Sequence, residues 1–130
     1  MILFINTASY DEIIITLLDG AKKIKTKKFK APRKQAEKLL PAVDKLIIAA
    51  HKKLTDVKKI QVVVSGGSFT SLRIGVVTAN ALAYALHIPI EAVGADGKIL
   101  ENQQAKKFES YNIVTPQYDR EPNIGVKKKK

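Results

Sequence analysis

Few residues of this 130-residue chain have the types and spacing that covalent chemistry requires. The segment GGSFTS, residues 66–71, lacks the Gly-Lys-Ser/Thr ending of a P-loop, and Ser68 lacks the second glycine of a nucleophile elbow. Its backbone amides could hold an anion at a helix start, but a plain strand-to-helix turn explains them as well. His51 and His87 each stand at an expected helix end, and the acidic residues show no metal-ligand spacing. We therefore expect no catalytic residue, metal site or cofactor.

Lysine dominates the charge of the chain. The net charge is +11, and of 23 basic residues only Arg33, Arg73 and Arg120 are arginine. Lysine is a good point charge but lacks the planar fork that suits phosphate and base recognition. Two interpretations stay open, a solvated lysine-rich surface and a surface that meets RNA. The candidate RNA-contacting residues are Lys22, Lys23, Lys25, Lys27 and Lys28.

Hydrophobic patterning predicts an α/β lobe in the order β-β-β-α-β-α-β. Asp19-Gly20 suits a tight hairpin between the second and third strands. The lysines of the third strand suit an edge position, where charge discourages further pairing. The helices are expected on one or both faces of a mixed sheet. The predicted strands cover residues 2–5, 12–18, 22–29, 59–65 and 89–95, and the predicted helices begin near residue 32 and near residue 68.

The first predicted helix has one apolar stripe, with Pro41 inside it as a potential kink. Lysines lie on the opposite side of this helix, and Ile48 sits off the stripe near Asp44. The stripe residues are Ala36, Leu40, Val43, Ile47, Ala50 and Leu54, widened by Leu39 and Leu46.

The second predicted helix is apolar on two sides, because residues 74–90 contain no charged side chain. A two-layer domain can bury one side, and an exposed second side marks a partner site. Small residues such as Gly75, Ala79, Ala81 and Ala85 would let another helix approach closely. The alternative is that residues after Gly97 cover this helix, although residues 101–110 are mostly polar. The sheet-facing stripe is Leu72, Val76, Ala79, Ala83 and Leu86, widened by Leu82; the other side carries Ile74, Val77, Ala81 and Ala85, with Tyr84 at its margin.

The segment SGGSFTSLRIGVVTANALAYALHIPI, residues 65–90, resembles the signature of TsaB (YeaZ), a family of bacterial tRNA threonylcarbamoyladenosine biosynthesis proteins. That signature typically reads GPGSFTGLRIG, followed by a helix rich in small residues. The opening MILFINTAS, the segment APRKQAEKLLPAVDKLI and the late segment IVTPQYDREPNI are also similar to the family. The resemblance implies a ribonuclease-H-like lobe of the actin-like ATPase superfamily, in a reduced form that lacks most of the second lobe.

The resemblance implies a noncatalytic subunit that binds a TsaD-like transferase through its two helices, with TsaE as a further partner. Homodimers through the same helices are also expected, and tRNA contact is expected to be indirect or weak. Asn6 replaces the usual aspartate, Ser71 replaces a glycine and the first helix lacks its histidine, which argues against nucleotide binding. A basic RNA-binding module, a homodimeric paralogue with another partner and a degenerate ATPase lobe remain alternatives. The expected interface comprises Asp44, Ile48, Arg73, Ile74, Val77, Ala81 and Tyr84.

The expected organisation is one TsaB-like lobe over residues 1–97, an extension over 98–126 that packs on or near it, and a disordered lysine tail over 127–130. The opening residues lack the basic flank and cleavage site of a signal peptide. No apolar run approaches the ~20 residues that cross a bilayer. We therefore expect a cytoplasmic protein without membrane contact.

Overall fold

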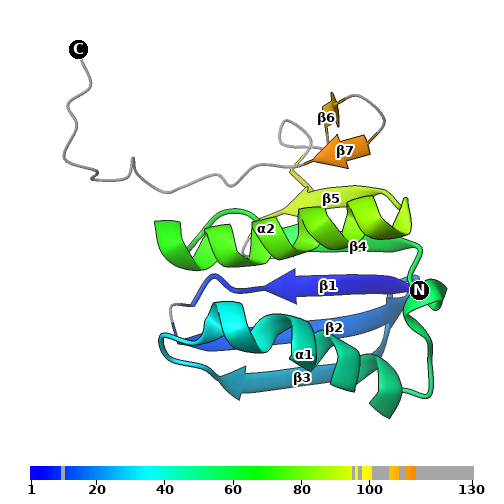
Figure 1. Cartoon of the computed structure of the whole chain (residues 1–130), viewed down its shortest axis with the longest axis horizontal. Helices are drawn as coiled ribbons and strands as arrows, with labels where there is room; N and C mark the ends of the chain where they lie inside the picture. Colours follow the sequence, from blue (N-terminus) through cyan, green and yellow to red (C-terminus); the bar gives the residue numbers. More distant parts are fainter. Residues whose placement is uncertain (10, 95, 97, 101–105, 109–110, 114–130) are drawn as a thin grey trace.

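The computed structural model describes residues 1–9, 11–94, 96, 98–100, 106–108 and 111–113. Through residue 94 it follows the predicted order β-β-β-α-β-α-β (Figure 1). It adds a short 3-10 helix, η1, and an antiparallel pair, β6 and β7, that the sequence did not predict. The elements are β1 (Ile2–Asn6), β2 (Glu12–Asp19), β3 (Lys22–Lys30), α1 (Gln35–Ala49), η1 (Leu54–Asp56), β4 (Lys59–Val63), α2 (Phe69–Leu86), β5 (Ile90–Val93), β6 (Lys106–Phe108) and β7 (Tyr111–Ile113).

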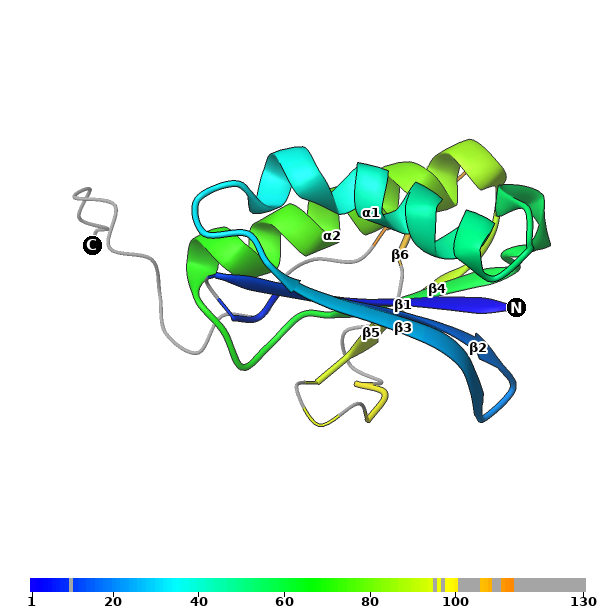
Figure 2. The same cartoon turned by 90° about the horizontal axis from the view of Figure 1, so that it is seen from below.

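The main sheet has five strands in the order β3-β2-β1-β4-β5. β1, β2 and β3 form an antiparallel meander, whereas β4 pairs in parallel with both β1 and β5, and α2 is the crossover helix between β4 and β5. The lysine-rich β3 occupies the edge, as predicted. Both helices cover the same face of the sheet (Figure 2), which answers the question that the sequence left open.

The core lies between this sheet face and the two helices. Alternate strand residues such as Leu3, Ile15 and Ile60 point toward the helices and are fully buried. Their neighbours on the opposite face, including Phe4 and Ile14, are only half-buried. The described part of the chain therefore builds two layers, one sheet and one pair of helices.

The predicted stripe of α1 was confirmed in part, because Leu39, Val43, Leu46 and Ile47 are buried, but it was wrong at its other turns. Ala36 and Leu40 are exposed, and Leu54 lies beyond the helix in η1. The reason is Gln35, a buried residue whose Nε2 donates to the Ser9 carbonyl at 2.7 Å and to the Glu12 carbonyl at 3.0 Å. These hydrogen bonds fix the rotation of α1 about its axis. The buried residues of α1 are Gln35, Leu39, Ala42, Val43, Leu46 and Ile47.

Helix α2 approaches β1 so closely that no side chain fits at Gly75. A Cβ there would lie 2.5 Å from the Oγ1 of Thr7, a buried residue whose hydroxyl donates to the Ser71 carbonyl. Gly75 and Ala79 are both buried against the sheet, so the expectation that they meet a partner helix was wrong. Ser68 caps α2 as predicted, since its Oγ accepts from the Ser71 amide at 3.1 Å.

The segment after β5 turns back toward the lobe. The Leu100 amide donates to the Ala92 carbonyl at 3.0 Å, and β7 contacts α2. The alternative that residues after Gly97 cover α2 is therefore confirmed only in part, because β7 contacts this helix. Val77 is still 57% exposed, and Tyr84 is still 51% exposed. Most of the predicted extension and the whole lysine tail lie outside the described residues. Within the described part, no helix is both long and apolar enough to cross a membrane.

Replacing Gln35 with leucine should lower the free energy of unfolding by about 1–3 kcal/mol, because two backbone carbonyls lose their donor. Urea unfolding measures this cost. Lys38→Gln, on an exposed position of the same helix, is the control and should change stability by no more than about 0.5 kcal/mol. Equal stability of the two variants would contradict the role given to Gln35.

Gly75→Ala should cost about 1–3 kcal/mol of unfolding free energy, because the new methyl group overlaps the Thr7 side chain. The same change should cost at least about 1 kcal/mol less in a Thr7→Ala background, where the overlapping atoms are gone. A double-mutant cycle measured by urea unfolding gives this coupling. Identical costs in the two backgrounds would show that the close approach does not restrict residue 75.

Candidate partner-binding site

The helices present large apolar side chains on their outer side, away from the sheet. We call this side the helix-layer surface. Burying such side chains is favourable, and a cluster of exposed ones marks an interaction site. Its large apolar members are Leu40, Ile48, Leu54, Val77 and Tyr84, each at least 40% exposed.

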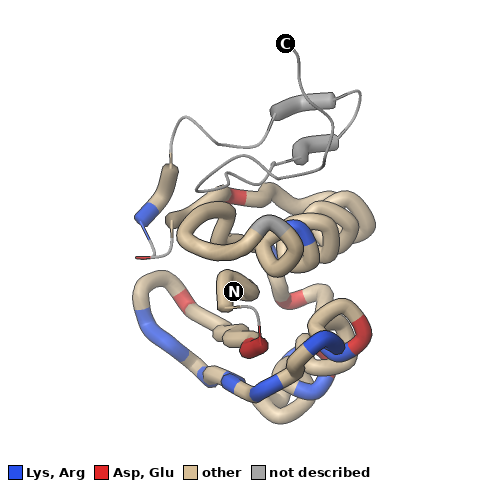
Figure 3. Tube along the Cα trace, turned by 90° about the vertical axis from the view of Figure 1, so that its left-hand side faces the viewer, with Lys and Arg blue, Asp and Glu red and all other residues tan. Residues whose placement is uncertain are grey.

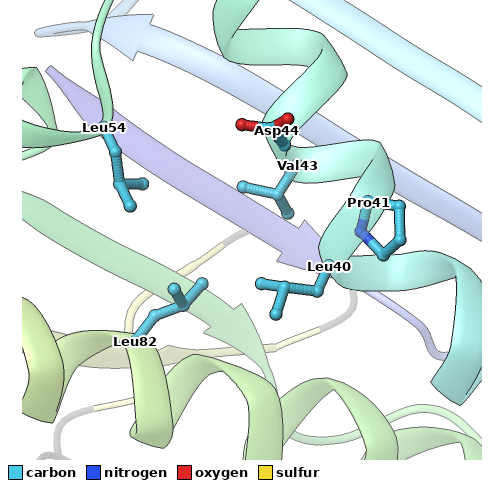
Figure 4. A pocket seen from close by; sticks show the side chains of 6 residues that line it. All are labelled: Leu40, Pro41, Val43, Asp44, Leu54 and Leu82. Atoms are coloured by element: carbon cyan, nitrogen blue, oxygen red, sulfur yellow. The ribbon is translucent and has the colours of Figure 1, made fainter.

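A groove lies between α1 and α2 within this surface and encloses about 420 Å³. Leu40, Leu54 and Leu82 point into it from α1, η1 and α2 (Figure 4). Pro41 and Val43 complete the apolar lining, and Asp44 is the one charged side chain among the described residues that line it. A groove of this kind fits an apolar side chain from another polypeptide better than it fits a polar ligand.

The α2 residues predicted for the interface fall on one stripe of the helix. Arg73, Val77, Ala81 and Tyr84 are exposed, at spacings of four, four and three residues. Ile74 differs, because it is half-buried and packs against the core. Tyr84 also contacts His87 edge to face, with ring centroids 6.4 Å apart. The α2 stripe is thus a continuous, mainly apolar strip with Arg73 at its start.

The two residues predicted on α1 lie in different places. Asp44 lines the groove between α1 and α2. Ile48 is 63% exposed, farther along α1 than the groove residues. The structure therefore places Asp44 on the same groove as Leu82 of α2, whereas Ile48 extends the apolar surface toward the end of α1.

Sequence reasoning missed the groove because it assigned Leu40 and Leu54 to the core. The pattern did contain a usable signal. Leu39, Ala42 and Leu46 repeat at intervals of three and four residues from Gln35, which leaves Leu40 one position off the buried side. Leu82, predicted to widen the sheet-facing stripe of α2, lies at its boundary and is half-buried.

The glycine turn that opens α2 packs tightly against the loop after β1. A Cβ on Gly67 would lie 2.4 Å from the Ala8 carbonyl oxygen, so only glycine fits there. Asn6 supports the same loop, because its Oδ1 accepts from the Ala8 amide at 2.9 Å. The polar groups at this end of the sheet thus hold the loop and the helix start together, which favours the plain strand-to-helix turn over an anion site.

The loop also carries Asp11, whose carboxyl group has two hydrogen-bonding neighbours. A hydrogen bond from the Ser9 hydroxyl and the nearby Lys30 ammonium lower the pKa of Asp11. Since its folded pKa lies below the unfolded one, Asp11 contributes stability at neutral pH that is lost as the pH falls through the folded value. Among the described residues, no group of three or more acidic, histidine or cysteine side chains could hold a metal ion.

The meander, the two parallel strands and the paired helices define a single α/β lobe of the ribonuclease-H-like fold, as found in the actin-like ATPase superfamily. Residues 28–108 match the family model described as TsaD: tRNA N6-adenosine threonylcarbamoyltransferase. The chain belongs to this family, and its relatives place it with the TsaB (YeaZ) proteins, as the sequence motif indicated.

Two relatives carry that assignment. The tRNA threonylcarbamoyladenosine biosynthesis protein TsaB of Bacillus subtilis (strain 168) is 36% identical over 80 residues, which cover 62% of this chain and 33% of that protein. The solved structure of YeaZ from Pseudomonas aeruginosa superposes with a TM-score of 0.66 at 30% identity, over 72% of this chain and 43% of the other. The chain therefore spans about a third of the length of its curated relative.

Val77→Glu should leave the fold intact, because Val77 is 57% exposed on the helix-layer surface. Its unfolding free energy should change by no more than about 0.5 kcal/mol. Val76→Glu, one residue earlier and 2% exposed, should cost more than about 3 kcal/mol or prevent folding, because it buries a charge in the core. Thermal unfolding of the pair separates the two sides of α2. Unfolding of the Val77 variant would mean that this side belongs to the core.

Proposed function

We propose that this chain is a noncatalytic partner subunit in tRNA threonylcarbamoyladenosine biosynthesis. It binds a TsaD-like transferase through the helix-layer surface. The observation that carries the proposal is the set of exposed apolar side chains on helices that already bury their other side against the sheet. Membership of the TsaB family supplies the pathway and the kind of partner.

Burial of a modest apolar area would be enough for a specific complex. If association hid about 400 Å² of apolar area, the gross gain would be about 10 kcal/mol at ~25 cal/mol per Å². Loss of translational freedom and desolvation of polar groups remove much of this gain. The α1–α2 groove adds specificity, because a protruding apolar side chain of the partner can enter it between Leu40 and Leu82.

The noncatalytic part of the proposal is supported by how the loop after β1 uses its polar groups. Asn6 stands where the family motif usually has an aspartate, and Thr7 follows it. In this chain the Asn6 side chain accepts from Ala8 and the Thr7 hydroxyl donates to Ser71. Both groups therefore take part in hydrogen bonds within the fold. TsaE as a further partner, a homodimer through the same helices and a cytoplasmic location belong to the same proposal.

Sedimentation velocity of the chain mixed with a TsaD-like protein tests the partner role. A heterodimer is expected at micromolar concentrations, and Val77→Glu should weaken it at least about tenfold by placing a charge in an apolar contact. Lys23→Glu is the control. Lys23 is exposed on β3, the edge strand far from α2, and it lies on the face of the sheet opposite the helices.

Absence of a complex at micromolar concentrations would contradict the proposal. A complex that loses equal affinity through both variants would contradict the assigned surface but not the partnership. If the chain instead forms a homodimer that Val77→Glu dissociates, the surface stands and its occupant is a second copy.

A further inference from the structure

The five strand lysines predicted to contact RNA do not form one patch. In antiparallel pairs, opposite residues share a face of the sheet. Lys25 and Lys27 pair with Leu17 and Ile15 and so lie on the helix side, whereas Lys23 and Lys28 pair with Leu18 and Ile14 on the open side. Lys22 lies beside the hairpin turn, opposite Asp19. The edge strand thus divides its positive charge between two surfaces.

On the helix side, β3 and α1 together enclose a groove of about 460 Å³. We call it the lysine groove. Basic segments of β3 and α1 lie side by side in Figure 3, where lysine and arginine are blue. Four lysines and one glutamate line the groove, so its charge is strongly positive. The lining residues are Lys27, Phe29, Lys34, Glu37, Lys38, Pro41, Ala42 and Lys45.

The four groove lysines are not neutralised by ion pairs within the described part of the chain. The described ion pairs join Lys28 to Glu12, Lys30 to Asp11 and Lys59 to Glu91, none of which involves a groove lysine. Concentrating unpaired like charges costs electrostatic free energy, which an anionic ligand would recover. The clustered charge therefore favours a site that binds an anion over a surface that is only solvated.

We propose that the lysine groove binds the phosphate backbone of RNA; that this RNA is tRNA rests on the function proposed above. From Lys34 to Lys45, α1 rises about 16 Å at 1.5 Å per residue. One strand of an RNA duplex presents several phosphates over that length. Phe29, whose ring lies 5.6 Å from the Lys27 ammonium, gives the groove an apolar floor for a ribose or an unstacked base.

RNA fits this groove better than an acidic protein or a membrane does. The planar fork of arginine suits carboxylates and phosphates alike, and no described residue that lines the groove is an arginine, so the groove attracts anions through point charges. Lysine point charges suit the evenly spaced phosphates of a nucleic-acid backbone. A flat bilayer would meet the exposed Lys34, Lys38 and Lys45 but not the half-buried Lys27 and Phe29, whereas a nucleic-acid backbone can follow the groove between strand and helix.

The lysine groove and the partner groove occupy opposite flanks of one helix. Pro41 lines both, while Leu40 and Asp44 face α2 and Lys38 and Lys45 face β3. RNA and a protein partner can therefore bind at the same time, with α1 between them. This arrangement would place the RNA backbone next to a transferase held on the helix-layer surface.

Fluorescence anisotropy with a labelled tRNA transcript, titrated with the whole chain at several salt concentrations, tests the proposal. The double variant K38Q/K45Q should bind about tenfold more weakly, and the slope of log K against log salt should fall by about 1.4–1.8, because two phosphate contacts are lost. The matched control is K23Q/K28Q, which removes the same charge from the open side of the sheet and should keep most of the affinity and slope.

Equal losses of tRNA affinity in the two double variants would contradict the proposed site, because binding would then depend only on net charge. Binding of polyglutamate as tightly as tRNA would also overturn it, because the site would then take acidic protein. Sedimentation of K38Q/K45Q with the TsaD-like protein separates this inference from the proposed function. If K38Q/K45Q loses RNA binding but still forms the heterodimer, the result supports the lysine groove as an RNA site. If the unmodified chain forms no heterodimer but its RNA binding still depends on Lys38 and Lys45, only the partner role is contradicted.

Discussion

A two-layer domain can bury only one side of each helix, and the rest of this structure follows from that constraint. α1 and α2 both pack on the same face of the five-stranded sheet. Their sheet-facing residues fill the core, so Val77 and Tyr84 are left at the outer surface. The same packing leaves a groove on each flank of α1, one apolar and one rich in lysine. The proposed partner and RNA sites are both consequences of a helix pair with a single covering layer.

The rotation of α1 decides which side chains enter those grooves. Gln35 sets this rotation through two hydrogen bonds to the loop that joins β1 and β2. With Gln35 buried, Leu40 turns toward α2 and Lys38 turns toward β3. At the other helix, the contact between Gly75 and Thr7 holds α2 against β1. The hydrogen bonds of Gln35 and the contact between Gly75 and Thr7 therefore position the helix-layer surface and the lysine groove, although these residues line neither of them.

The sequence predicted the elements well, because each has a strong local signal. Alternating β-branched residues, the Asp19-Gly20 turn and the Ser68 cap are all properties of neighbouring residues. The buried side of α1 was not predictable from the apolar pattern alone, since Leu39 and Leu40 are equally apolar and the choice rests on a glutamine that bonds to residues 9 and 12. The lysine groove was missed for a similar reason: Lys27 and Lys45 are distant in sequence and meet only through the packing of α1 on β3.

The account depends most on the helix-layer surface contacting another protein. Photo-crosslinking from a benzoylphenylalanine placed at residue 77, in the chain mixed with a TsaD-like protein and tRNA, tests this most directly. The account predicts a cross-linked product that contains the TsaD-like protein, and no such product from the same probe at residue 61 on the opposite sheet face. Cross-linking to that protein from residue 61 alone, or to nothing from residue 77 while a complex sediments, would contradict it.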